Sequence, residues 1–497
     1  MSERSAGILL AVSSLPSHYG IGTFGEAARR WIDFLKEAGQ KYWQILPLGP
    51  TGWGDSPYQS FSAFAISPYS IDPDILRDQG LLTREELEAV PWGIKPNRVY
   101  YSTLYAHRGK LLRRAFARFK DNPSAHGENA FQGFRGKNAA WLNDYSLFMA
   151  LKRHNKGASW LEWEEKLRFR EEKTLVKYQE KLAEDIEYHS WVQFQAHTQW
   201  EDIKAYANSN GVSIIGDIPI YVALDSADTW SNSGLFQLDD QRRPIRVAGC
   251  PPDPFAAGGQ LWGNPLYRWD VLEQSGYGWW IFRLRTCMQL YDVTRIDHFR
   301  GFESYYSIPA ADKDASRGEW VKGPGLSFIN TINRELPGAN IIAEDLGYLT
   351  TEVRELLRAS GYPGMKVLQF AFDSRESSDY MPHTFERHCV VYTGTHDNPT
   401  SLGWFKTARF EDVVLAREYL GLRDIREGHW AFIRSALSSV ADLAIIPMQD
   451  YLGLGTTGRM NTPSTTGGNN WRWRMHGEAL QGELAKKIEH LTHIYGR

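Results

Sequence analysis

The sequence predicts an α/β fold, a (β/α)8 barrel of the TIM type, in a chain of 497 residues. Eight short β-rich apolar runs end in polar residues. Their apolar residues are continuous rather than alternating, which is typical of strands covered on both faces. Helix-like stretches separate most of these runs. We expect strands at residues 8–13, 42–48, 213–220, 292–298, 341–346, 366–372, 389–396 and 443–449.

The helices are expected between these strands and after the last one. Apolar periodicity indicates helices at 25–39, 191–208, 279–291, 327–336, 351–361, 412–440 and 478–493. A barrel of this kind needs about 250 residues, so nearly half of the single barrel at 1–497 must be insertion.

Two insertions account for most of this excess. We place a charged, helix-rich insertion at 71–190, after the second strand, and a Gly/Pro/Trp-rich insertion at 221–275, after the third. Insertions after strands lie at the C-terminal face of a barrel, where active sites are built. No separate C-terminal β domain is expected.

The composition argues against several classes of partner. Fifty-six Lys and Arg residues against 59 Asp and Glu residues give a net charge of −3, which provides no general field for a nucleic acid or an anionic membrane. Three cysteines without a Cys-x-x-Cys pair argue against a disulfide framework or a cysteine-rich zinc site. No apolar run approaches the roughly 20 residues that span a bilayer. Residues 7–12 indicate a buried strand rather than an export signal, so we expect a cytoplasmic protein.

Aromatic residues are abundant, with 19 Trp and 24 Tyr. Flat rings with a polar edge suit the faces and hydroxyl rims of sugars, so a sugar ligand is one interpretation. Core filling is the other interpretation, and it must account for most of these side chains.

Acidic side chains recur at the ends of four predicted strands: Asp217, Asp297, Glu344 and Asp397. Because parallel barrel strands end on one rim, we expect Asp297, Glu344 and Asp397 to share a pocket. The alternative is that such acids cap the following helices. Four aligned sites with Arg and His neighbours favour a functional site.

Two carboxyl groups across a pocket are what glycosidic chemistry requires. Arg295 lies two residues before Asp297 on the same strand face and is expected to keep that aspartate ionised. Neighbouring negative charge raises the pKa of the other acid. The residues therefore predict Asp297 as the anion and Glu344 as the proton donor.

We expect no metal and no cofactor. Asp297-His298 and His396-Asp397 offer possible ligands, but no His-x-His or His-Glu-x-x-His spacing occurs, and arginines beside the acids repel a cation. A G-x-G-x-x-G match at 453–458 is followed by an irregular loop instead of the helix that a dinucleotide site needs.

Short motifs along nearly the whole chain then indicate a family. They are Ser13-Ser-Leu-Pro-Ser17, Ile45-Leu-Pro-Leu-Gly-Pro50, Gly54-Asp-Ser-Pro-Tyr-Gln59, Gly216-Asp-Ile-Pro-Ile-Tyr221, Pro251-Pro-Asp253, Gln260-Leu-Trp-Gly-Asn-Pro-Leu-Tyr267, Arg295-Ile-Asp-His-Phe-Arg-Gly301, Ala343-Glu-Asp-Leu-Gly347, Thr395-His-Asp-Asn398 and Asn470-Trp471. Together they resemble the 4-α-glucanotransferases of glycoside hydrolase family 77, the amylomaltases or disproportionating enzymes. The resemblance implies maltooligosaccharides and α-1,4-glucans as partners.

The resemblance also implies roles for individual residues. Asp297 corresponds to the nucleophile, Glu344 to the general acid/base, and Asp397 to the carboxylate that grips sugar hydroxyls. The implied substrate-binding residues are Ser56, Tyr58, Asp217, Trp262, Asn264, Arg295, His298, His396 and Asn470. Trp53 and Tyr101 resemble the aromatic pair of a more distant glucan groove, and the loop at 248–259 resembles a mobile active-site loop.

The implied mechanism is a two-step, retaining transfer, for which we expect the carboxyl groups of Asp297 and Glu344 to lie about 5 Å apart. A retaining α-amylase-type hydrolase and a catalytically inactive glucan-binding barrel are the alternatives. Strand three ends in Ile218-Pro-Ile-Tyr221 instead of the Asn-His typical of amylases, which disfavours the hydrolase.

Overall fold

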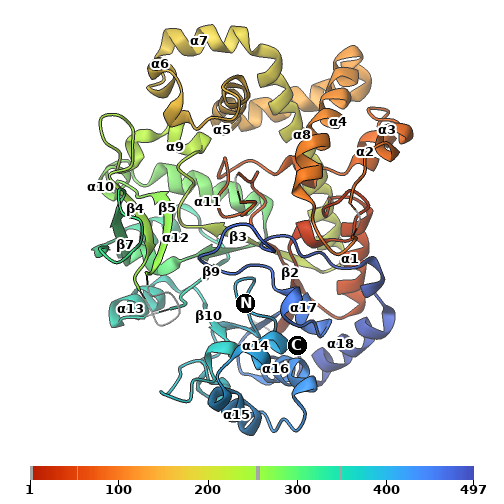
Figure 1. Cartoon of the computed structure of the whole chain (residues 1–497), viewed down its shortest axis with the longest axis vertical. Coiled ribbons are helices and arrows are strands. Elements are labelled where there is room, and N and C mark those ends of the chain that lie inside the picture. Colours follow the sequence, from red (N-terminus) through yellow and green to blue (C-terminus); the bar gives the residue numbers. More distant parts are fainter. Residues whose placement is uncertain (1–3, 53, 94, 253–257, 348) are drawn as a thin grey trace.

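The computed structural model describes residues 4–52, 54–93, 95–252, 258–347 and 349–497, and its largest sheet has eight parallel strands (Figure 1). Their order is β10-β11-β12-β1-β2-β3-β6-β9. The two strands at the ends of this order are joined where the Ala343 N–H donates to the Pro363 carbonyl at 3.0 Å. The sheet is thus a nearly closed barrel, which confirms the predicted fold class. The strands are β1 Ser5–Leu9, β2 Tyr42–Gln44, β3 Ser213–Pro219, β6 Val293–Asp297, β9 Ile341–Ala343, β10 Gly364–Val367, β11 Cys389–Tyr392 and β12 Leu443–Pro447.

The barrel strands are buried on both faces. One set of alternate residues, including Leu9, Ile215 and Ile445, packs together in one cluster. The intervening residues, such as Ile8 and Ile214, belong to a second cluster with the surrounding helices. Because successive side chains of a strand point to opposite faces, this arrangement requires apolar residues at every position, which explains the continuous runs.

Helices surround the barrel, as expected, but several predicted boundaries differ from those observed, and two differences change an element. The helix expected at 412–440 is two helices, because the chain turns at Gly421, whose φ of 60° suits glycine and ends the first of them. The strand expected at 366–372 ends at Val367 and continues as a 3-10 turn. The helices are α1 Glu26–Glu37, α8 Ala183–Ser209, α11 Gly278–Leu290, α12 Gly325–Glu335, α13 Thr351–Ser360, α14 Ser401–Thr407, α15 Phe410–Tyr419, α16 Gly428–Ser438 and α18 Gly482–Ile494.

The segment after β2 is rich in helices, which Figure 1 shows gathered at one end of the molecule. Its longest helix, α5 (Glu128–His154), packs along α8. A buried hydrogen bond of 2.9 Å joins Ser146 of α5 to Ser190 of α8. α8 begins within this segment, at Ala183, and ends at Ser209, just before β3. One helix therefore connects the segment to the barrel. The helices of the segment are α2 Pro73–Asp78, α3 Arg84–Glu88, α4 Tyr101–Asp121, α5 Glu128–His154, α6 Glu165–Arg168 and α7 Glu172–Lys181.

A second, antiparallel sheet was not predicted. Its order is β5-β4-β7-β8. Two strands come from the Gly/Pro/Trp-rich insertion, together with α9 Ala227–Ser231 and α10 Trp269–Gln274, whereas the other two follow the fourth barrel strand. Within it, β4–β5 and β7–β8 are local antiparallel pairs, whereas β4 pairs with β7 about 60 residues further along the chain, a contact for which the sequence gives no local signal. The strands are β4 Arg246–Cys250, β5 Gln260–Pro265, β7 Ser304–Pro309 and β8 Glu319–Lys322.

Within the described ranges, every helix is too short or too polar to cross a membrane.

Candidate active site

A cavity of about 860 Å³ opens at the C-terminal ends of the barrel strands. The end of β6 supplies Asp297 and His298, and the loop after β11 supplies His396 and Asp397. The sheet β5-β4-β7-β8 supplies the wall around Trp262. The cavity thus lies where the predicted insertion at 221–275 meets the barrel rim, and the insertion at 71–190 supplies none of its described lining residues. The polar and aromatic lining residues include Ser56, Tyr58, Gln59, Tyr221, Trp262, Asn264, Asp297, His298, Lys313, Asp314, His396, Asp397, Asn461 and Trp471.

Arg295 binds two aspartates in the floor of the site. The parallel register of β3 and β6 places Asp217 opposite Arg295 and Pro219 opposite Asp297. One guanidinium nitrogen, Nη1, lies 2.7 Å from each carboxylate oxygen of Asp217, and Nη2 lies 2.9 Å from Oδ1 of Asp297. Burial raises the pKa of Asp297, and the positive charge of Arg295 opposes this rise.

Glu344 follows β9 and is buried beside Asp297. Its Oε2 accepts a hydrogen bond of 2.6 Å from the His298 N–H, and its Oε1 accepts one of 2.9 Å from the Leu346 N–H. The left-handed backbone of His298, with φ of 58°, accompanies this contact. Burial raises the pKa of Glu344 well above its usual range, and the negative charge of Asp297 adds to the rise.

The position of Glu344 differs in one respect from the sequence prediction. Asp297 and Asp397 line the cavity directly, whereas Glu344 lies just outside the set of described lining residues and is 8% exposed. Its carboxyl group is bonded to the backbone of the residue that follows Asp297. The three acids thus gather at one rim, and Glu344 is the most buried of them.

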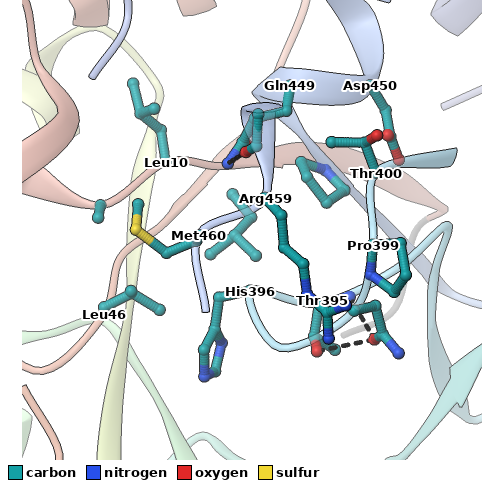
Figure 2. Close-up of a pocket in the computed structure, with 15 residues that line it drawn as sticks. Leu10, Leu46, Thr395, His396, Pro399, Thr400, Gln449, Asp450, Arg459 and Met460 are labelled. Carbon is teal, nitrogen blue, oxygen red and sulfur yellow. Dashed lines mark hydrogen bonds between the residues drawn. The ribbon is translucent and has the colours of Figure 1, made fainter. Parts of the chain in front are cut away.

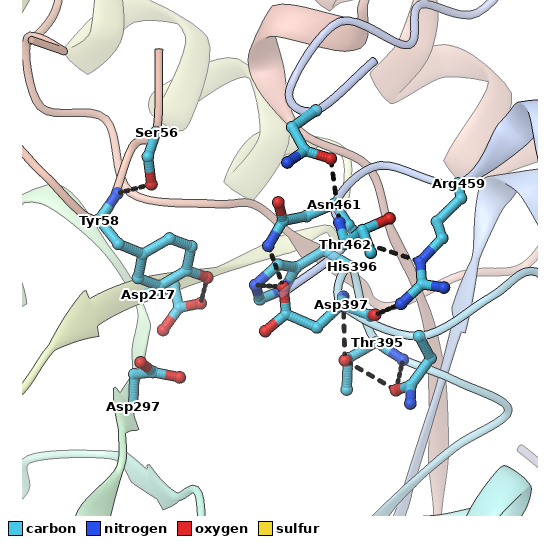
Figure 3. Close-up of polar contacts among 12 residues, drawn as sticks. Ser56, Tyr58, Asp217, Asp297, Thr395, His396, Asp397, Arg459, Asn461 and Thr462 are labelled. Carbon is cyan, nitrogen blue, oxygen red and sulfur yellow. Dashed lines mark hydrogen bonds and ion pairs between the residues drawn. The ribbon is translucent and has the colours of Figure 1, made fainter. Parts of the chain in front are cut away.

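Asp397 lies in the loop that follows β11 (Figure 3). Its Oδ1 accepts a hydrogen bond of 2.6 Å from Nδ2 of Asn461 and lies 3.5 Å from Nε2 of His396. The side chain is 44% exposed, the most open of the three acids. Figure 3 shows its carboxyl group on the side that faces Tyr58 and Asp297.

Aromatic rings border the acids on two sides. Tyr58 stacks on His396 with ring centroids 5.1 Å apart, and its hydroxyl donates to Oδ2 of Asp217 at 2.6 Å. Trp262 meets the ring of His298 edge-on at 4.9 Å. The indole of Trp262 is only partly buried, so it offers a flat apolar surface to the cavity.

Two further predicted residues support these rings. Oγ of Ser56 accepts from the Tyr58 N–H at 3.3 Å. Asn264 is buried, donates from Nδ2 to the Val222 carbonyl at 2.9 Å, and accepts from Nε2 of Gln59 at 3.0 Å. Both residues also line the cavity.

Two predicted residues lie elsewhere. Asn470 is 7% exposed and holds its own loop, because it accepts from the Thr462 N–H and donates to the Thr465 carbonyl. The ring of Tyr101 is 5% exposed, and its hydroxyl donates to the Trp471 carbonyl at 3.0 Å, so its neighbour Tyr105, 51% exposed, presents the open aromatic surface there.

Two other predictions fall wholly or partly outside the described residues. Trp53, the first residue of the distant aromatic pair, is one of them, and the centre of the loop at 248–259, residues 253–257, is the other.

Sequence reasoning missed Arg459 and Asn461, which contact the loop of Asp397. They occupy the segment after the eighth barrel strand that the sequence marked only as irregular. An asparagine in such a segment is usually a turn residue, so no local signal could have assigned it to the site. Across the ranges that the structure describes, no group of three or more His, Cys, Asp and Glu side chains is arranged to hold a metal ion.

The paired charges around Arg295 predict a large stability effect. Replacing Arg295 by methionine leaves the buried carboxylate of Asp217 without its cation, so we expect the free energy of unfolding to fall by about 3–5 kcal/mol. Urea denaturation measures the change. The control Arg84→Met removes an exposed partner of Glu88, for which no measurable change is expected. Equal losses in the two variants would contradict the prediction.

Comparisons with known proteins identify the family of this chain. A family model described as 4-alpha-glucanotransferase, for glycoside hydrolase family 77, matches residues 10–481. The chain belongs to this 4-α-glucanotransferase family. It is 47% identical to a 4-alpha-glucanotransferase of Clostridium butyricum, over 98% of this chain and 99% of that protein. It is also 47% identical to one of Thermus thermophilus, over 97% of this chain and 96% of that protein.

Solved structures support the same assignment for this family 77 chain. An amylomaltase from Streptococcus agalactiae, solved in complex with acarbose, is 39% identical, covers 100% of both chains and superposes with a TM-score of 0.96. An amylomaltase from Corynebacterium glutamicum is 18% identical over 99% of this chain and 75% of that one, with a TM-score of 0.78, and shows the shared fold. The activity of this glucanotransferase is therefore the transfer of glucan segments, as its relatives' names state.

Proposed function

We propose that this chain transfers α-1,4-glucan segments by retaining double displacement, with Asp297 as nucleophile and Glu344 as general acid/base. The observation that carries this proposal is the pair of acids at one rim with divergent surroundings. Arg295 lies 2.9 Å from Asp297 and favours its ionised form, whereas burial and the charge of Asp297 favour the protonated form of Glu344.

In the first step a carboxylate oxygen of Asp297 attacks the anomeric carbon of the donor. The bond from this carbon to the leaving oxygen breaks as Glu344 gives that oxygen its proton. The part of the donor on the reducing side leaves, and a β-linked ester joins the remaining glucan to Asp297. We assign Asp397, together with His396, to hydroxyl groups of the sugar unit at the cleavage point.

In the second step the 4-hydroxyl group of an acceptor attacks the same carbon. Glu344, now ionised, removes the proton of this hydroxyl, and the ester to Asp297 breaks to leave a new α-1,4 bond. Transfer exceeds hydrolysis when a sugar occupies the acceptor side and excludes water. The partly open ring of Trp262 supports a place for the acceptor on that side.

The substrate class follows from the cavity. Acarbose is bound in the Streptococcus agalactiae relative, and a cavity of about 860 Å³ bordered by Tyr58 and Trp262 suits several consecutive glucose units of a maltooligosaccharide. Gln59 links the two sides, because its Nε2 donates to Asn264 and lies 3.4 Å from the Trp262 carbonyl.

Incubation with maltotriose as the sole sugar tests the proposal. We expect glucose together with a ladder of maltooligosaccharides longer than maltotriose, and only α-1,4 linkages in the proton NMR spectrum of the products. A hydrolase would release only shorter sugars, and a glucan-binding protein would leave maltotriose unchanged. A new β-linkage would contradict the retaining mechanism.

A further inference from the structure

Residues 459–461, which follow β12, hold the loop of Asp397 through hydrogen bonds, and we call this contact the clasp. Arg459 donates from Nη2 to the Asp397 carbonyl at 2.6 Å and from Nε to the Asn461 carbonyl at 2.7 Å. The Asn461 N–H donates to the His396 carbonyl at 3.1 Å. Three hydrogen bonds thus fix the backbone around Asn461 against the backbone around Asp397.

The same segment is anchored in the barrel core. Met460 is 4% exposed, and its carbonyl accepts from the Trp471 N–H at 2.8 Å. Figure 2 shows Arg459 and Met460 beside His396, around a small pocket of about 20 Å³. Because both sides of the clasp are packed, the relative placement of Asn461 and Asp397 is set by the fold rather than by side-chain rotation.

The Asn461 side chain completes the clasp at the reacting end. Its amide donates to Oδ1 of Asp397 at 2.6 Å, and no group in the described part of the chain donates to Oδ2 (Figure 3). Asn461 and Asp397 both line the cavity. One oxygen of the carboxylate is therefore bound to the protein, while the other remains available to a sugar hydroxyl.

We propose that Asn461 is a positioning residue, whose amide N–H holds Oδ1 of Asp397 and so orients this carboxylate for the grip on the sugar at the cleavage point. This inference rests on the role given to Asp397 in the proposed function. A carboxylate whose orientation is fixed accepts a hydrogen bond from a sugar hydroxyl in a fixed direction. Hydrogen bonds to sugar hydroxyls strengthen in the transition state of glycosidic cleavage. Loss of the amide should therefore lower kcat more than it raises KM.

Other charged groups face the same carboxylate and must be considered in any pH experiment. Asp297 from β6, Tyr58 from the segment after β2 and Arg459 from the segment after β12 interact with it electrostatically, and His396 precedes it. All four remain in a variant of Asn461, so the ratio of variant to wild-type rate isolates the changed side chain.

The decisive variant is Asn461→Asp, which keeps the side-chain shape and replaces the donor by a carboxyl group. Two carboxylates at hydrogen-bond distance repel each other, which favours the binding of one shared proton at acidic pH. Above neutral pH the donor is absent, and we expect kcat for maltotriose to fall roughly 10- to 100-fold, the effect of losing a hydrogen bond to a charged group. As the pH falls the pair takes up a proton, which the introduced carboxyl group can donate to Asp397, so the rate ratio should rise at least several-fold from pH 8 to pH 5.

Two comparison variants separate positioning from a general disturbance. Asn461→Ala has no group to protonate, so its rate ratio should be low and independent of pH. Asn208→Asp creates a similar carboxylate pair with Asp292, which Nδ2 of Asn208 contacts at 2.8 Å near the opposite end of β6. That variant should keep the wild-type kcat and pH profile, and thermal denaturation of each variant reports folding.

The outcomes are distinct. A rate ratio for Asn461→Asp that stays constant between pH 5 and pH 8, or wild-type kcat in Asn461→Ala, overturns the inference. If Asn461→Asp does not fold, the KM and kcat of Asn461→Ala decide, because a loss confined to KM contradicts positioning. Asp397→Asn tests the underlying role separately: full activity in that variant overturns the assignment of Asp397 itself.

Discussion

Replacing Asp297 by asparagine removes the proposed nucleophile, and we expect the rate of maltotriose disproportionation to fall by about 10⁴-fold or more, as when a catalytic nucleophile is removed elsewhere. The amide cannot form the ester to the anomeric carbon. Glucan binding should persist, because Tyr58, Trp262 and the rest of the cavity wall are unchanged. Chromatography of the products measures the rate, and calorimetric titration with a maltooligosaccharide measures binding.

A matched control for Asp297→Asn is Asp270→Asn, which changes an exposed aspartate paired with Arg268 outside the cavity. Its activity should equal that of the wild type. Loss of activity in both variants would point to a general effect on the preparation, and persistent transfer by Asp297→Asn would show that another group attacks the sugar.

Replacing Glu344 by glutamine removes the group that we propose as the acid of the first step and the base of the second. With maltotriose we expect a loss of about 10²- to 10⁴-fold, the usual contribution of general acid–base catalysis. A maltosyl fluoride donor needs no protonation of its leaving group, so the first step should recover. Azide, an anion that needs no base, should then attack the β-linked ester to Asp297, restore turnover and give an α-linked maltosyl azide.

The recovery with fluoride and azide distinguishes an acid/base residue from a structural one. If Glu344→Gln stayed inactive with both, the role of Glu344 as acid/base would be wrong.

The pH dependence of the wild-type rate provides a second measurement. Because burial and the charge of Asp297 raise the pKa of Glu344, its protonated form persists at neutral pH and is lost as the pH rises through that raised value. The wild-type kcat for maltotriose should therefore decline on the alkaline side, and the fluoride reaction of the variant should not.

The barrel could be predicted because its strands are buried on both faces. Burial on both sides requires continuous apolar runs such as Ile214 and Ile215 in β3, and such runs are visible without knowledge of the fold. Helix ends were harder to place. The break between α15 and α16 depends on one turn at Gly421, within a stretch whose periodicity continues on both sides.

The site was predicted only in part. Asp297 and Asp397 line one cavity, which follows from the shared rim of parallel strands. Asn470 was predicted to bind substrate, but its side chain is largely buried and bonded within its own loop. Tyr101 was predicted for a separate, more distant groove, and its ring is also largely buried. Both predictions depend on side-chain exposure, which the sequence does not record.

The sequence by itself determined the fold class, the family and the acids that carry the proposed chemistry. These depend on the pattern of the strands and on short motifs, and both consist of residues that are neighbours in the chain. The tertiary structure decided the rest. It placed Asn461 against Asp397, paired β4 with β7 and bound Glu344 to the backbone beside Asp297. These features arise from contacts between residues far apart in the chain, and local sequence patterns contain no information about such contacts.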